Sequence, residues 1–252
     1  MKLSIITILL FLAISAMSQK GIRKHQAKQM MVTDLQNFKG GKAIFKTKYN
    51  HIYTVVFVPD SEFINAAPVS PCSNNNFTGT ARKACKISIA QAPLVNMSFP
   101  AFLKSLPSDA TMMADPNIKS AANNPRVAKE NRNIALTAVF LYGIKRESDN
   151  DYHLIIGDKN KTFFNVEISG LPPTSAASYA VLQKARAKVE AYFGKPNCNM
   201  GGYMVFPQGI SMQVSGSTFY DIDHAPGTVG PQGYTPNTAW EIHPVTDITF
   251  LK

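Results

Sequence analysis

The order of the secondary-structure elements expected in the C-terminal half of this chain constrains its fold more than any other feature. Apolar and polar residues alternate there in five runs, and alternation with period two is typical of half-buried strands. The predicted strands are Ile134–Arg146, Asp151–Ile156, Thr162–Ile168, Ile210–Phe219 and Trp240–Val245, the last extended by Ile248–Leu251. Between the third and fourth strands, apolar residues recur at helical spacing from Thr174 or Ser175 to Phe193, and Gly194 then ends the predicted helix.

Strand, strand, strand, helix, strand, strand is the connectivity of a small oligonucleotide/oligosaccharide-binding (OB) barrel, whose loops and one open face carry function. We therefore expect a mainly β fold with some helix, in which residues 132–252 form a five-stranded OB-like barrel with one helix between strands three and four.

The region before this barrel, residues 19–131, divides into two parts. The alternating runs Lys42–Lys48 and His51–Val58, joined by a turn, predict an N-terminal β-hairpin. Residues 59–131 are rich in Pro, Asn and Ser, and predict a long irregular insertion with one short helix near Ala101–Leu106.

Residues 1–18 have the pattern of a signal peptide, with Lys2, an apolar run over Leu3–Ile14 and small residues before Gln19. The apolar run is shorter than the ~20 residues of a membrane span, so the pattern favours cleavage over a membrane anchor. We expect a secreted or periplasmic protein with no transmembrane span. Residues 20–36 are basic and weakly periodic, which is compatible with a short surface helix or a disordered arm.

The chain has three cysteines. Cys72 and Cys85 flank a short polar loop, and an exported chain meets an oxidising compartment, so we expect a disulfide between them. Cys198 is then left over, either buried as a small apolar residue or free to pair with another chain.

Strand periodicity assigns several polar side chains to the face opposite the core. Tyr152, Leu154 and Ile156 share one face of the second strand, which places His153 and the preceding Asp151 on the other. The same reasoning applies in strands three and five. We expect four candidate catalytic residues to line a single exposed surface, with His suited to acid–base work by its near-neutral pKa: His153, Glu167, Glu241 and His243.

The stretch after the fourth strand brings two carboxylates and an imidazole within four residues. Asp221, Asp223 and His224 are competent ligands for Zn or Mn, so they are the candidate metal ligands. No ligand spacing such as His-Glu-x-x-His occurs. Alternating polar residues are also expected on solvated faces of any antiparallel sheet, and that interpretation stays open.

Four stretches resemble a series found in uncharacterised secreted bacterial OB-fold-like proteins, which carry D-x-H-L, E-I-P, F-x-D-x-x-H and E-[IL]-H-P-V in this order. The corresponding stretches are Glu147–Leu154, Val166–Ile168, Phe219–His224 and Glu241–Val245. The resemblance covers residues 134–250. Gly170 and Leu171 stand before Pro172, which loosens the E-I-P element. The resemblance implies the position of a site and no activity.

The net charge of +10 favours anionic partners. We expect a binding module for an anionic polymer, nucleic acid or glycan, along strands two and three and the loop 221–237, with stacking on Tyr152, Phe163 or Tyr220. Tyr152 is the weakest of these candidates, because the strand repeat assigns it to the core face. The first alternative is a metal-assisted hydrolase, nuclease- or phosphodiesterase-like, that uses the His, Asp and Glu side chains. The second is a structural or interaction protein of the cell envelope. No P-loop or Gly-x-Ser-x-Gly motif is present.

Overall fold

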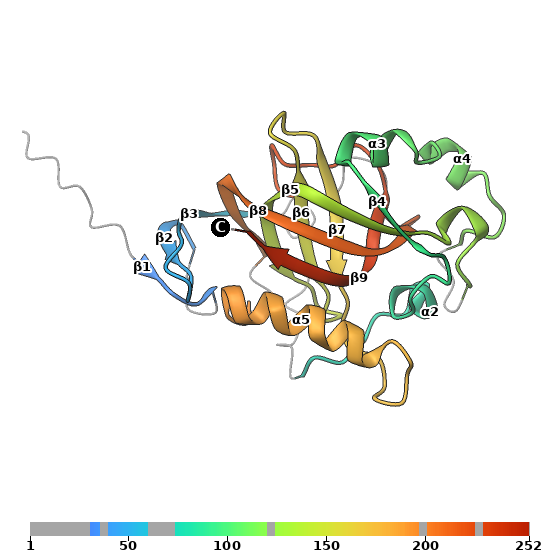
Figure 1. The fold of residues 1–252 in the computed structure, drawn as a ribbon, viewed down its shortest axis with the longest axis horizontal. Coiled ribbons are helices and arrows are strands. Elements are labelled where there is room, and N and C mark those ends of the chain that lie inside the picture. Colours follow the sequence, from blue (N-terminus) through green and yellow to red (C-terminus); the bar gives the residue numbers. More distant parts are fainter. Residues whose placement is uncertain are drawn as a thin grey trace, which may run out of the picture. The chain divides into compact units, whose positions relative to one another are not determined.

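A computed structural model describes residues 31–35, 40–59, 74–119, 124–196, 201–224 and 229–251, and these residues form a mainly β structure (Figure 1). The strands are β1 (Met31–Val32), β2 (Lys42–Lys46), β3 (Ile52–Pro59), β4 (Leu94–Met97), β5 (Asn133–Arg146), β6 (Tyr152–Gly157), β7 (Phe163–Ile168), β8 (Gly202–Tyr220) and β9 (Trp240–Phe250). The helices are α2 (Lys83–Lys86), α3 (Phe99–Lys104), α4 (Asp109–Met113), α5 (Tyr179–Phe193) and the 3-10 turn η3 (Ala128–Glu130). The prediction of a mainly β fold is confirmed.

The strands form one sheet in the order β1-β2-β3-β8-β9-β7-β6-β5-β4, and β8 pairs in addition with β5. β5, β6 and β7 form an antiparallel meander. β9 lies parallel to β7 and antiparallel to β8, which returns antiparallel to β5. Each of these five strands therefore pairs with two others of the set. Helix α5 lies between β7 and β8 in the sequence, as predicted, and packs along β9 (Figure 1).

Two element boundaries differ markedly from the predictions. Helix α5 begins at Tyr179, because the residues from Thr174 to Ser178 form turns after Pro173. Strand β8 begins at Gly202 instead of Ile210. Pro207 and Gly209 look like turn residues in the sequence, but they occupy an irregular stretch within one long strand, where the pairing with β5 shifts register.

The predicted N-terminal hairpin is confirmed as β2 and β3, which pair antiparallel from Lys42–Val56 to Lys46–Ile52. Met31–Val32 pairs parallel with β2, while the rest of residues 20–36, apart from 33–35, lies outside the described residues. The predicted signal peptide lies outside them as well. Within the described ranges, no helix has the length and apolar character needed to cross a bilayer.

The described parts of the predicted insertion, residues 74–119 and 124–131, contain more regular structure than expected. The short helix near Ala101–Leu106 is present as α3, where the Ser98 hydroxyl accepts a hydrogen bond from Ala101 N at 3.4 Å and Pro100 lies in the first turn. Phe102 packs edge-on against Phe164 of β7 at a ring separation of 5.1 Å. The insertion therefore shares its hydrophobic core with the C-terminal strands.

The outer face of the C-terminal strands is covered. Residues 74–92, here termed the covering segment, run across it, and several of their contacts with it are hydrogen bonds. Ser169 Oγ donates to Lys86 O at 2.6 Å, and Ala90 N donates to Ser217 Oγ at 2.8 Å. A buried Arg82–Glu130 ion pair at 2.7 Å anchors the segment to η3. This second layer decides the environment of the polar side chains on β6, β7 and β9.

Candidate functional site

The two-residue repeat assigns the strand faces correctly. Tyr152, Leu154 and Ile156 are buried in the main hydrophobic core, and His153 points to the opposite face. His153 pairs across the sheet with Glu167, and Asn165 of β7 pairs with Glu241 of β9. The strand register thus brings the four candidate catalytic residues together, as predicted.

Their predicted exposure was wrong. Glu167 and His243 are 0% exposed, Glu241 is 1% exposed and His153 is 7% exposed. The reason is the covering segment, together with the residues that follow β8, which pack on the outer face and exclude solvent from it. A solvated sheet face has therefore become a buried polar layer.

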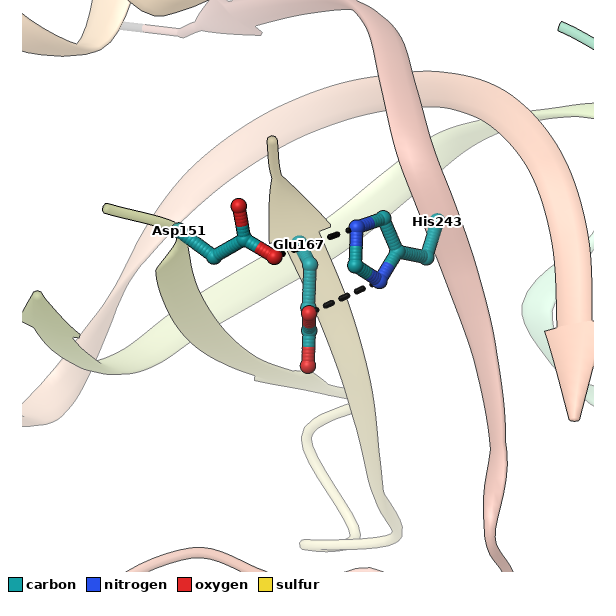
Figure 2. A group of neighbouring side chains, drawn as sticks. All are labelled: Asp151, Glu167 and His243. Carbon is teal, nitrogen blue, oxygen red and sulfur yellow. Dashed lines mark ion pairs between the residues drawn. The ribbon is translucent and has the colours of Figure 1, made fainter. Parts of the chain in front are cut away.

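Asp151, Glu167 and His243 form the first of two side-chain groups, the inner group (Figure 2). Asp151 precedes β6, Glu167 lies on β7 and His243 lies on β9, so three adjacent strands contribute. In Figure 2 both carboxylates point at the His243 ring, with Asp151 Oδ2 3.3 Å from Nε2 and Glu167 Oε2 2.8 Å from Nδ1. One potential ligand atom from each residue lies within 4.8 Å of the others.

Four atoms of the inner group make no hydrogen bond, although they lie at ion-pair distance: Asp151 Oδ2, Glu167 Oε2, and His243 Nδ1 and Nε2. The remaining carboxylate oxygens are satisfied. Gly170 N donates to Asp151 Oδ1 at 2.5 Å, and Asn165 Nδ2 donates to Glu167 Oε1 at 2.8 Å. These hydrogen bonds hold the two carboxylates in place, and the atoms that make no hydrogen bond face one another.

Asp221, His224 and Glu241 form the second group, the outer group. His224 Nδ1 lies 3.2 Å from Asp221 Oδ2 and 3.8 Å from Glu241 Oε1. The His224 side chain is 25% exposed, so this group reaches solvent. Asp223, the third predicted metal ligand, is exposed and outside the group. Only its backbone N–H takes part, by donating to Asp221 Oδ1 at 3.0 Å.

Glu241 connects the two groups. Its Oε1 faces His224, whereas its Oε2 lies 3.6 Å from His243 Nδ1 of the inner group and makes no hydrogen bond. Asn165 Nδ2 donates to Glu241 Oε1 at 2.9 Å as well as to Glu167 Oε1. One amide therefore orients a carboxylate from each group.

The inner group is strongly charged. Burial would raise the pKa of the Glu167 carboxyl, but His153 and His243 outweigh it and hold that pKa well below its usual range. Burial would lower the pKa of His243, yet Glu167 and Asp151 raise it well above its ordinary value.

In the outer group as well, the surroundings favour an ionised carboxylate at Asp221 and a protonated imidazole at His224. Burial opposes ionisation of Asp221, but His224 and Lys86 lower its pKa below the usual range. Burial would lower the pKa of His224, and the carboxylates of Asp221 and Glu241 raise it to about 11. Lys86 Nζ contacts Asp221 Oδ2 at 3.1 Å.

Three residues of the site, Asp151, Lys86 and Asn165, were not among the predicted catalytic residues or metal ligands. Asp151 was predicted to share a strand face with His153 but was given no role. Asn165 carried a usable signal, since it shares the outer face of β7 with Glu167. Lys86 carried none, because it comes from a segment without periodicity and lysine is ordinarily exposed.

The predicted Cys72–Cys85 disulfide is not present. Cys85 is a free, buried thiol, and its Sγ donates to Asn124 O at 3.0 Å and accepts from Arg82 Nη2 at 3.6 Å. These two contacts hold the sulfur in the interior of the protein. Cys72 and Cys198 lie outside the described residues.

Comparison of the chain with protein-family models, with curated proteins and with solved structures finds no match.

Proposed function

We propose that this protein binds a divalent transition-metal ion at the inner group of Asp151, Glu167 and His243, on the outer face of an OB-like barrel. The observation that carries the proposal is the set of four buried, mutually facing atoms of the inner group that make no hydrogen bond. An imidazole with carboxylate oxygens is a donor set that suits Zn or Mn.

An ion-pair network is the competing explanation for the inner group, and its geometry is poor. Both carboxylates lie close to the ring nitrogens of His243, at 2.8 and 3.3 Å, yet none of the four facing atoms makes a well-directed hydrogen bond. Each unsatisfied buried donor or acceptor costs about 1–3 kcal/mol, and more when charged. A cation bound to one ring nitrogen and its neighbouring carboxylate lowers this cost, and the other ring nitrogen then keeps its hydrogen for the second carboxylate.

The surroundings of the inner group match those of metal sites. A ligating histidine usually has its second nitrogen next to a carboxylate, which fixes the ring orientation. His243 has a carboxylate on each side, so one is placed as a ligand partner and the other as an orienting group. Asn165 and the backbone of Gly170 fix those carboxylates in turn.

The OB-like barrel is supported by the strand pairing. β5, β6, β7, β9 and β8 pair in a cycle that ends with β8 against β5, and α5 lies between the third and fourth of them in the sequence. This is the strand order and helix position expected for that architecture.

Binding of an anionic polymer receives less support from the side chains. Tyr152 and Tyr220 are 0% and 1% exposed, which removes two of the three residues expected to stack on bases or sugars. Phe163 is half-buried and remains available. The excess of basic residues still favours anionic partners. If the protein binds an anionic polymer, its affinity for that polymer should fall steeply as the salt concentration rises.

Metal-assisted hydrolysis is the second candidate function, because the outer group extends the polar layer to solvent at His224. Carboxylates and imidazoles next to a bound ion can activate water. Phosphodiesterase activity that requires added Mn or Zn, and that disappears in Glu167→Gln, would support it. Equal activity of that variant and the unmodified protein would exclude this site.

Metal analysis tests the main proposal. The protein is stripped with a chelator, reloaded with Zn or Mn, desalted and analysed for bound metal. We expect at least one tightly bound ion in the unmodified protein and in Asp223→Asn, and loss of the inner ion in Glu167→Gln and Asp151→Asn. Asp223 is the matched control, because it is an acidic neighbour outside both groups. A folded, unmodified protein that retains no ion refutes the proposal.

A further inference from the structure

We infer a second divalent-cation site beside the first, formed by Asp221, His224 and Glu241, with Glu241 shared between the two. This inference rests on the proposed metal-binding function and extends it from one ion to an adjacent pair. The second ion lies on the solvent side of the first.

The position of Glu241 is the first argument. It stands two residues before His243 on β9, so both side chains point to the same face of the strand. One of its oxygens faces His224 and the other faces His243, at 3.8 and 3.6 Å. The residue is 1% exposed and its Oε2 has no hydrogen-bond partner. A carboxylate that directs one oxygen into each of two ligand groups has the arrangement of a bridging ligand.

Charge is the second argument. The two groups bring together four buried carboxylates, and the cation that accompanies them from outside the groups is Lys86. Lys86 and one divalent ion in the inner group bring three positive charges to the four carboxylates, so one negative charge remains. Metal-bound histidines are neutral, so a second ion would take the place of any proton on His224 and add positive charge beside Asp221 and Glu241.

The donor atoms of the outer group are the third argument. Asp221 and Glu241 supply carboxylate oxygens and His224 supplies an imidazole nitrogen, the same chemistry as in the inner group. His224 Nδ1 makes no hydrogen bond, although two carboxylates lie near it. Lys86 fixes Asp221 Oδ2, as Asn165 fixes Glu241 Oε1.

Accessibility separates the two sites. The inner group is 0% exposed, whereas the His224 side chain is 25% exposed. The outer ion should therefore exchange faster and respond first to a chelator. Paired sites of this kind are used by hydrolytic metalloproteins to hold the two oxygens of a displacement, which makes Mn and Zn the ions to test.

Mn titration of the chelator-treated full chain is the experiment, with bound metal counted after desalting and followed by electron paramagnetic resonance. We expect two ions in the unmodified protein, with spectral broadening from spin coupling, and one uncoupled ion in His224→Ala. The affinity for the second ion should fall by more than about 100-fold in that variant. Glu241→Gln should weaken both ions, and Asp223→Asn should weaken neither.

The possible outcomes separate the two proposals. One ion in both the unmodified protein and His224→Ala overturns the second site and leaves the first intact. Two uncoupled ions, or two ions that persist in His224→Ala, overturn the assignment of the second ion to this position. No bound ion in the unmodified protein overturns the proposed function itself. His224 is partly exposed, so its truncation is compatible with folding.

Discussion

The Arg82–Glu130 ion pair should be the main electrostatic anchor of the covering segment, and Glu130→Gln tests this. Both residues are almost fully buried, at 1% and 0% exposure. The guanidinium makes two parallel hydrogen bonds to the carboxylate, at 2.7 and 2.8 Å. Glu130 also accepts from Val127 N at 2.8 Å and from Tyr220 N at 2.9 Å. A glutamine has the same size but turns one acceptor into a donor that faces other donors.

The expected loss follows from what remains in the variant. Burial would lower the pKa of Arg82, but Glu130 more than offsets this and raises it, so the guanidinium stays charged. Removal of one partner from a buried pair leaves an uncompensated charge and costs about 3–5 kcal/mol. For a chain of this length each 1 kcal/mol shifts Tm by about 2–4 °C, so Tm should fall by about 6–20 °C.

The neighbouring residue provides the control. Lys129 also forms an ion pair, with Asp115 at 2.9 Å, but its side chain is 42% exposed. Exposed pairs contribute about 0–1 kcal/mol, so Lys129→Ala should be nearly neutral. Both variants are compared by urea denaturation followed by circular dichroism. If Glu130→Gln costs no more than Lys129→Ala, the covering segment is held by other contacts and the reasoning fails.

Three further predictions concern the same layer. With the other two cysteines replaced by serine, Cys85 should react with a thiol reagent only on unfolding, since burial raises its pKa, and rapid native labelling would contradict this. Burial, and then the charge of Asp151, raise the pKa of Asp149 from 3.8 to about 6. The native state therefore favours the neutral carboxyl, and the stability that this neutral form provides is lost as pH rises through about 6. In metal-free protein, Asp149→Asn should abolish a stability loss of roughly 1–3 kcal/mol between pH 4 and 7, and an unchanged pH profile in urea melts would disprove it. A Cβ at Gly170 would lie 2.7 Å from the backbone of Phe77, so Gly170→Ala should cost about 1–3 kcal/mol, and a Tm shift below about 1 °C would count against this close approach.

The strands of the C-terminal half were predictable because their alternation is set by local geometry. Side chains on a strand point alternately to opposite faces, so the burial of Tyr152 in the core fixes the direction of His153. The same rule places Glu241 and His243 on one face. The start of β8 was predicted wrongly, because Pro207 and Gly209 are residue types typical of turns and yet lie inside this strand.

The burial of the site was not predictable, since it depends on contacts between segments far apart in the chain. The covering segment has no periodic pattern, and it binds through backbone groups such as the Lys86 carbonyl that Ser169 contacts. A sequence gives no sign that such a segment will lie over a polar face. For this reason an expected solvated surface proved to be a buried layer, and the fixed role of Lys86 went unrecognised.

The position of the site at one end of the sheet explains which residues it contains. Asp151 precedes β6, Glu167 lies near the end of β7, His243 lies near the start of β9, and Asp221 follows β8, so one end of four strands supplies the ligands. The covering segment meets this end through Lys86. Bound ions would therefore cross-link the ends of four strands. An ion that binds only the native state adds about 2.7 kcal/mol to the free energy of unfolding at a concentration 100 times its Kd. The inner group is the more enclosed of the two groups, so an ion there should contribute more of this stabilisation than an ion in the outer group.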